Sequence, residues 1–251
     1  MSTTIRTAYA PALATIASLV AACSALGQAQ DPALQKEPTW EKSAALGLTL
    51  TRGNSETLLF TGNIQATKKL PEHEFNLGAD ATYGENEDVK NAENFRGYGQ
   101  YNRLFTEHFF GYLRLEALHD DIADIDYRIT VGPGVGYYFI KEKDMSLRAE
   151  LGPAYVHEKQ GGEVNDYLTL RIAERFDWKI NERAKLWQSL EFLPQVDDWD
   201  NFIVNAEIGL ETSITAQVNL RTYLQDTYDN EPAPDREKND LKFVTAIAYK
   251  F

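Results

Sequence analysis

The sequence predicts an all-β fold: a closed antiparallel transmembrane β-barrel of about twelve strands with up-and-down topology. Three observations support this prediction. Large apolar residues alternate with polar or small ones in about twelve successive runs, which is the period-two pattern of strands with two different faces. The number of runs is even, and the last run ends on the aromatic residue Phe251. An apolar segment that is typical of an export signal precedes the first run.

The first segment of the chain is predicted to direct export and to take no part in the barrel. Residues 7–30 carry no charge, and their apolar centre has the length of a signal-peptide core but is too short to span a bilayer. Small residues here predict cleavage after Ala29, so residues 1–29 form the signal peptide and residues 30–39 a periplasmic linker. A lipoprotein signal, in which Cys23 would carry the lipid, is the alternative.

Composition and charge exclude several other classes of protein. After residue 31, no apolar run approaches the roughly 20 residues that a membrane-spanning helix needs, and the mean hydropathy is -0.43. The net charge of -13 argues against a nucleic-acid partner, because phosphate binding requires clustered Lys and Arg. The single cysteine excludes an intrachain disulfide framework and a cysteine-based zinc site. We expect no cofactor.

The alternating runs together cover residues 40–251, which we predict to form the outer-membrane barrel. A strand of about a dozen residues crosses the hydrocarbon layer of a membrane when it is tilted. In chain order, the runs are predicted at about 40–52, 56–68, 74–84, 94–105, 108–119, 127–140, 145–157, 166–179, 184–194, 201–213, 216–228 and 241–251.

Each run is assigned as a strand because its two parities differ in character. The apolar parity, which we expect to face lipid, includes in chain order Leu46, Leu48, Phe60, Ile64, Phe75, Leu77, Leu113, Leu115, Val131, Val135, Leu147, Leu151, Leu168, Ile172, Leu186, Leu190, Ile208, Leu210, Leu220, Leu224, Phe243 and Ile247. The polar or small parity, which we expect to face inward, includes Asn63, Gln65, Asn76, Asp80, Arg96, Gln100, Arg114, Glu116, Arg128, Gly134, Arg148, Glu150, Arg171, Arg175, Ser189, Glu191, Glu207, Glu211, Asn219, Arg221, Val244 and Ala246. This alternation is typical of membrane barrels.

Closure of the sheet follows from the membrane location. Lipid offers no hydrogen-bond partner, so every backbone N–H and C=O must be paired within the protein, and a sheet achieves this only by joining its two edges. The last run places Tyr249 and Phe251 on its large apolar face. These two residues resemble the C-terminal signature of bacterial outer-membrane β-barrels, which implies pairing of the last strand with the first. Outer-membrane lipid, lipopolysaccharide and the outer-membrane assembly machinery are then the expected partners.

The lengths of the connections predict the orientation of the barrel. Connections after the even-numbered runs are short, whereas those after the third, fifth, seventh and eleventh runs are predicted to be longer and mostly acidic. Short periplasmic turns and longer external loops are typical of outer-membrane barrels. The long connections are predicted at 85–93, 120–126, 158–165 and 229–240.

Two of the external connections carry clusters of aspartate. Carboxylates could gather Ca²⁺ or Mg²⁺ among lipopolysaccharide phosphates. Their spacing matches no calcium-binding loop, so we interpret the clusters as solvated external loops and expect no metal site. The clusters are Asp120, Asp121, Asp124 and Asp126, and Asp197, Asp198 and Asp200.

Three stretches of the chain resemble the salt-induced outer-membrane proteins, a family of unknown function in Gram-negative bacteria. The stretches are Gly47–Thr57, Val131–Tyr138 and Tyr249–Phe251. The resemblance covers about residues 40–251, although Arg52 stands where a small residue is expected. It implies an outer-membrane barrel linked to salt or osmotic adaptation, and it supplies no catalytic residue.

Charged residues on the inward parity are the candidate functional residues. One interpretation is a polar pore that selects small polar or ionic solutes through a transverse field between a cationic and an anionic sector. The other is an interior sealed by ion pairs, because buried charges must be paired. The candidate pore-lining residues are Arg114, Glu116, Arg128, Arg148, Glu150, Arg171, Arg175, Glu191, Glu207, Glu211 and Arg221.

Catalysis is the less favoured class of function. A hydrolase needs a nucleophile beside a base, and the inward Ser189 is linked by no motif to His119 or His157, which lie near the external rim. Gly132-x-Gly134-x-Gly136 alternates along one run instead of preceding a helix, so it predicts room inside a narrow barrel and not a phosphate-binding loop. We therefore predict a protein that is not an enzyme, with an outer-membrane lipid hydrolase or protease as the alternative.

Overall fold

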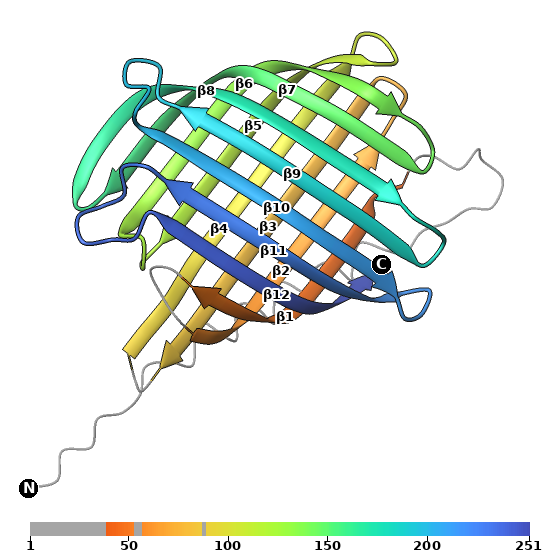
Figure 1. Cartoon of the computed structure of the whole chain (residues 1–251). Coiled ribbons are helices and arrows are strands. Elements are labelled where there is room, and N and C mark those ends of the chain that lie inside the picture. The colour runs from red at the N-terminus through yellow and green to blue at the C-terminus, as the bar shows by residue number, and fades with distance from the viewer. Residues whose placement is uncertain (1–38, 53–56, 87–88) are drawn as a thin grey trace, which may run out of the picture. The chain divides into compact units, whose positions relative to one another are not determined.

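The computed structural model describes residues 39–52, 57–86 and 89–251, which form a closed barrel of twelve antiparallel strands (Figure 1). The strands are β1 (Glu41–Arg52), β2 (Thr57–Lys69), β3 (His73–Asn86), β4 (Val89–Leu104), β5 (Phe109–Asp120), β6 (Ile125–Lys141), β7 (Met145–Gln160), β8 (Glu163–Lys179), β9 (Ala184–Pro194), β10 (Phe202–Ser213), β11 (Val218–Asp229) and β12 (Asn239–Lys250). The predicted all-β, up-and-down closed barrel is confirmed. Within the described ranges, no helix has the length and apolarity needed to cross a membrane.

Several predictions concern residues outside the described ranges. These are the signal peptide at residues 1–29, Cys23, nearly all of the linker at 30–39, and the turn at 53–55. They stay predictions.

The barrel closes by pairing β1 with β12. Their antiparallel register places Leu46 opposite Ile247. At the end of this seam, the backbone N–H of Phe251 donates to the carbonyl of Lys42 at 3.1 Å, and the rings of Tyr249 and Phe251 meet edge to face at 5.1 Å. The C-terminal aromatic residues therefore lie at the joint between the first and last strands. This pairing joins the two edge strands of the sheet, β1 and β12, to each other.

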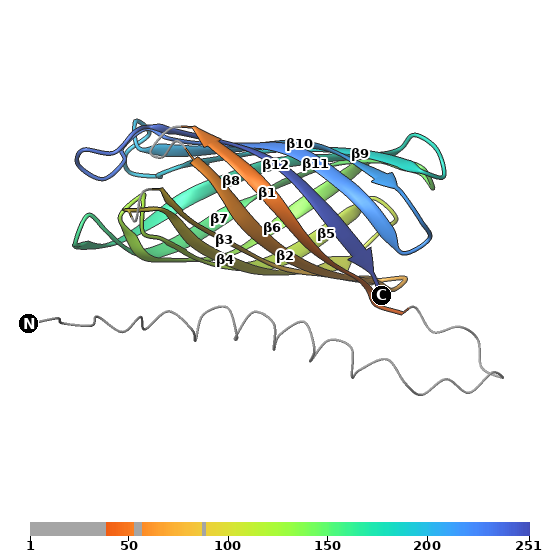
Figure 2. The same ribbon diagram turned by 90° about the horizontal axis from the view of Figure 1, so that it is seen from below.

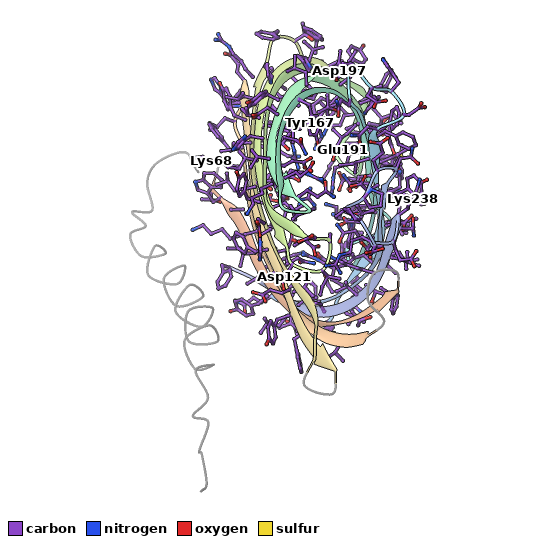
Figure 3. All side chains as sticks on the ribbon, turned by 90° about the vertical axis from the view of Figure 1, so that its left-hand side faces the viewer. Lys68, Asp121, Tyr167, Glu191, Asp197 and Lys238 are labelled. Carbon is purple, nitrogen blue, oxygen red and sulfur yellow. The ribbon has the colours of Figure 1, made fainter. Side chains whose placement is uncertain are left out.

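Figure 2 shows that the C terminus lies at the same end of the barrel as the β8–β9 and β10–β11 connections. We call this the C-terminal end, and it carries the connections that follow even-numbered strands. The opposite end carries the connections that follow odd-numbered strands. Figure 3 looks into the opposite end and shows Asp197 and Lys238 at its rim, with Tyr167 and Glu191 inside the ring of strands.

Apolar side chains cover the outer surface of the barrel, as the alternation predicted. Phe60 is 76% exposed and Leu46 is 67% exposed, whereas Asn102 and Asn219 are among the most buried side chains. Water-soluble proteins have the reverse arrangement, and they rarely expose large contiguous apolar surface. An apolar outer face with a polar interior is the arrangement of barrels solvated by lipid.

The predicted connections of the opposite end are wrong in length. β3 and β4 continue through most of residues 85–93, and β5 and β6 include the ends of the predicted 120–126 connection. The 158–165 connection shrinks to Gly161 and Gly162, whose φ angles of +60° and +81° form the tight hairpin turn that suits glycine. Polar side chains indicate that a segment is exposed to water, but they do not indicate that backbone pairing has ended. A strand that extends beyond the apolar band therefore resembles a loop in the sequence. The asymmetry in connection length is therefore wrong for these hairpins, although the predicted connection at 229–240 remains long at 230–238. The connection at 195–201, which was not predicted to be long, is long as well.

The inward glycines of β6 make room for aromatic rings of β5. A Cβ atom on Gly134 would overlap the ring of Tyr112, and one on Gly136 would overlap the ring of Phe110. These rings lie flat against the neighbouring backbone, so the wall can carry bulky residues without filling the interior. This confirms that the alternating glycines relieve crowding inside the barrel.

Candidate functional site in the barrel interior

A cavity of about 1100 Å³ occupies the barrel interior, and all twelve strands contribute to its lining. At the C-terminal end, its lining includes the connections at 142–144 and 181–183 together with Phe251. At its inner extreme, it reaches Asp80 on β3 and Asn205 on β10. The candidate site is therefore a polar chamber that begins at the C-terminal end.

Nine of the eleven candidate pore-lining residues line this chamber. Glu116 and Arg128 do not line it. Glu116 pairs with Arg96 and Arg114, which do line the chamber, and Arg128 lies toward the opposite end. The nine lining residues are Arg114, Arg148, Glu150, Arg171, Arg175, Glu191, Glu207, Glu211 and Arg221.

One ion-pair cluster joins the neighbouring strands β4 and β5. Arg96 donates from Nε and Nη2 to the two carboxylate oxygens of Glu116, at 3.0 and 2.9 Å. Arg114 donates to the same carboxylate at 2.6 Å and lies 4.9 Å from the centre of the Tyr98 ring. Two parallel charge-assisted hydrogen bonds and a cation–π contact fix both guanidinium groups against the wall.

A second cluster is centred on Glu150 of β7, which is only 5% exposed. Its carboxylate accepts from Arg148 at 3.0 Å, from Arg171 at 2.7 Å and from Gln100 at 3.0 Å. Arg171 also donates to Glu191 of β9 at 2.5 Å. This chain of contacts links β4, β7, β8 and β9. The predicted cationic and anionic sectors are therefore joined by direct ion pairs.

A third cluster is centred on Glu211 of β10. Its carboxylate accepts from Arg221 of β11 at 2.8 Å and from Lys250 of β12 at 2.8 Å. Arg221 also donates to the side-chain oxygen of Asn63 on β2 at 3.3 Å. This contact reaches past β12 and β1, so side chains on both sides of the closing seam meet inside the barrel.

One aromatic residue of the interior, Trp187, was missed by the sequence analysis. Trp187 on β9 is 7% exposed, and its Nε1–H donates to Glu207 at 2.5 Å. Its ring occupies the space where a Cβ of Gly209 would lie. The signal was present in the sequence, because Trp187 shares the inward parity of Ser189. Alternation alone did not identify Trp187 as an interior residue, because an aromatic side chain on the inward parity departs from the expected run of polar residues.

Side chains and one connection meet at the opposite end of the barrel. Arg128 of β6 pairs with Glu158, donates to Gln160 at 3.0 Å, and lies 3.9 Å from the carboxylate of Asp229 on β11. None of these four residues lines the large chamber. A separate cavity of about 30 Å³ beside Arg128 offers room on the scale of a single water molecule.

The β11–β12 connection at 230–238 also lies at this end. Ala233 is only 6% exposed, and it lies 3.6 Å from where a Cβ of Gly161 would be. Asn230 of the same connection donates to the carbonyl of Asp200 at 2.7 Å. The connection therefore contacts both the β7–β8 turn and the β9–β10 connection.

The histidines of the rim do not form a catalytic site within the described residues. His157 contacts Asp166 at 2.7 Å, and Tyr155 donates to the same oxygen at 2.6 Å, on the outward parity. Ser189 lines the chamber, and no hydrogen bond joins it to His119 or His157. In the part of the chain that the structure describes, no group of three or more His, Cys, Asp or Glu side chains is arranged to hold a metal ion.

Comparisons with known proteins agree with the fold. The sequence family described as "Protein of unknown function, DUF481" matches residues 44–251. The NanC porin has a similar structure, with a TM-score of 0.58 and 7% identity over 83% of this chain and 100% of that chain. An outer membrane channel from Pseudomonas putida F1 gives a TM-score of 0.54 and 6% identity over 89% of this chain and 100% of that chain. No curated protein matches the sequence. At such low identities, the structural likeness establishes a porin-like fold.

Proposed function

Since the chain belongs to the DUF481 family and has a porin-like fold, we propose that it resides in the bacterial outer membrane and lets small polar solutes pass through its interior. The observation that carries this proposal is the chamber of about 1100 Å³, which is lined by charged and amide side chains from every strand. A barrel that served only as a structural plug would have no need of a polar chamber of this size.

The outer surface supports the membrane location. Its exposed leucine, isoleucine, valine and phenylalanine side chains would be costly in water and are favourable in lipid. The aspartates at 197–200 lie at the opposite end, which we assign to the outside of the cell, and the C-terminal end then faces the periplasm. Lipid and lipopolysaccharide are the proposed partners of the outer surface, and the outer-membrane assembly machinery is the proposed partner of the C-terminal strand.

The chamber walls are suited to passive permeation. Fixed ion pairs and amides can replace part of the hydration shell of a passing solute, which is how pore linings reduce the cost of transfer. Solutes would enter freely at the C-terminal end. At the opposite end, passage requires separation of Arg128 from Glu158 and Asp229 and movement of the 230–238 connection. We therefore propose that the described conformation is the closed state of the channel.

We further propose a role in salt or osmotic adaptation. The resemblance of Gly47–Thr57, Val131–Tyr138 and Tyr249–Phe251 to the salt-induced outer-membrane proteins supports this role. A strain lacking the protein should then grow more slowly than its parent at high salt and equally well at low salt.

Conductance in planar lipid bilayers tests permeation directly. Replacing Arg128 and Glu158 together by Ala removes both partners of this ion pair, so neither Arg128 nor Glu158 is left without the other, although Asp229 loses its cation at 3.9 Å. We expect this variant to conduct more, or to open more often, than the parent protein. The matched control, Arg175→Ala with Asp177→Ala, removes an ion pair of the C-terminal end, where the chamber is already open, and should leave opening unchanged.

Silence of both the parent and the Arg128→Ala/Glu158→Ala variant, across salts and voltages, would reject permeation and favour a sealed, structural barrel. The enzyme alternative receives no support from Ser189, which is not hydrogen-bonded to His119 or His157 among the described residues.

A further inference from the structure

Resting on the proposed function, we propose that Glu207, together with Asp80, forms a site in the chamber that selects small monovalent cations over anions. Neither carboxylate belongs to an ion pair. Both line the chamber, Glu207 from β10 and Asp80 from β3. The site therefore differs from the three clusters, in which every carboxylate already binds a cationic side chain.

Glu207 and Asp80 differ from Glu74, another chamber-lining carboxylate without an ion pair, because Glu74 is only 4% exposed and accepts hydrogen bonds from both Asn102 and Tyr138. Each arginine of the strands that lines the chamber has a carboxylate within 4.0 Å. These arginines are Arg96, Arg114, Arg148, Arg171, Arg175 and Arg221. Among the described residues, Glu207 accepts only the Nε1–H of Trp187, and Asp80 makes no hydrogen bond or ion pair. A carboxylate left without a cation in a confined space is stabilised by any mobile cation that reaches it.

Glu207 is the less compensated of the two carboxylates. Its register neighbours are Ser189 on β9 and Gln225 on β11, which carry no charge. Lys242 faces the interior two strands away but does not line the chamber. Trp187 binds one carboxylate oxygen of Glu207, so the carboxylate is held in place while its other oxygen accepts no hydrogen bond from the described residues. These features make Glu207 a fixed negative charge on the chamber wall.

Asp80 lies across the interior from Glu207. Its register neighbours are Asn63 on β2 and Arg96 on β4. Asn63 is contacted from β11 by Arg221, which shows how closely the two walls approach each other. Since Arg96 and Arg114 share the single carboxylate of Glu116, Asp80 balances the excess positive charge beside it. The uncompensated charge is then that of Glu207, with Asp80 preventing the opposite wall from repelling a cation.

Cationic groups at the chamber mouth do not cancel this preference. Arg175 and Lys185 share the carboxylate of Asp177, and Lys250 shares that of Glu211 with Arg221, but the side chains of Arg175, Lys185 and Lys250 are 35%, 50% and 47% exposed. Exposed charges are screened by dissolved salt within about 10 Å at 0.1 M. The charges that a solute meets in the narrower interior therefore determine the selectivity.

Reversal potentials in a salt gradient test this inference. The parent protein, or the Arg128→Ala/Glu158→Ala variant where larger currents are needed, should show a preference for potassium over chloride. Glu207→Gln keeps the shape and the hydrogen bond from Trp187, and we expect it to reduce that preference strongly. Adding Asp80→Asn should shift the reversal potential to zero or to the anion side. The control, Glu142→Gln with Asp144→Asn, changes two carboxylates of the mouth and should leave the reversal potential unchanged.

Repeating the measurement with methylammonium chloride shows whether the site prefers an inorganic cation or an organic one. A preference for both potassium and methylammonium supports a site that recognises charge, and a preference for one identifies that ion as its ligand. Conduction with an unchanged reversal potential in Glu207→Gln/Asp80→Asn would overturn the inference while leaving permeation intact. A complete lack of conduction would instead remove the proposed function on which the inference rests.

Discussion

Glu150 offers the clearest test of how the interior is stabilised. Its carboxylate lies between Arg148 and Arg171 at 3.0 and 2.7 Å, and the residue is only 5% exposed. Glu150→Gln preserves the size of the side chain but removes its charge. The hydrogen bond from Gln100 can persist, while Arg148 loses its only carboxylate within 4.0 Å among the described residues.

The expected loss of stability follows from this burial. Removing one partner of a buried ion pair typically costs about 3–5 kcal/mol, because the remaining charge is left without compensation. Arg171 keeps Glu191, and Arg148 has a side chain that is 20% exposed, so we expect the lower end, about 3 kcal/mol. The free energy of unfolding can be measured by urea titration of the protein refolded in lipid vesicles, with tryptophan fluorescence as the signal.

Asp177→Asn is the matched control for this experiment. Asp177 also pairs with two cations, Arg175 and Lys185, but their side chains are 35% and 50% exposed. Ion pairs that are open to solvent contribute little, so the control should lose less than about 1 kcal/mol. Equal losses in the two variants, or a loss below about 1 kcal/mol in Glu150→Gln, would refute the reasoning that burial makes this cluster stabilising.

Two further predictions concern the closure and the outer surface. Gly161→Cys with Ala233→Cys should form a disulfide, because the Cβ positions would lie 3.6 Å apart, within the usual range for a disulfide, although the φ angle of +60° at Gly161 makes the cysteine strained there. Bilayer current should fall on oxidation and return on reduction. Current that does not depend on the redox state would contradict closure by the 230–238 connection. Ile247→Arg puts a charge on the outward face of β12, where Ile247 is 51% exposed, and should lower the free energy of unfolding in vesicles by about 2–4 kcal/mol if this position lies near the bilayer midplane. Ala248→Arg, on the buried inward face, tests the effect of crowding instead of the effect of lipid. An Ile247→Arg variant that is as stable as the parent would contradict the lipid-facing assignment of Ile247.

The sequence by itself determined the architecture of this protein. Because successive side chains of a strand point to opposite faces, alternation identified both the strands and the face that each residue occupies. It placed Leu46 and Ile247 outside and Arg171 and Glu191 inside, as the structure shows. The even number of runs and the aromatic C terminus predicted the pairing of β12 with β1.

Only the tertiary structure decided which charges meet and toward which end of the barrel the chamber lies. Arg128 lies near Asp229, and Arg221 contacts Asn63, although each pair is separated by at least about a hundred residues. Such contacts depend on the curvature and stagger of the closed sheet, which no local pattern encodes. The predicted strand ends were wrong for a related reason. Where a strand extends into water, its backbone pairing continues, but its sequence lacks the alternating apolar residues from which strands were predicted.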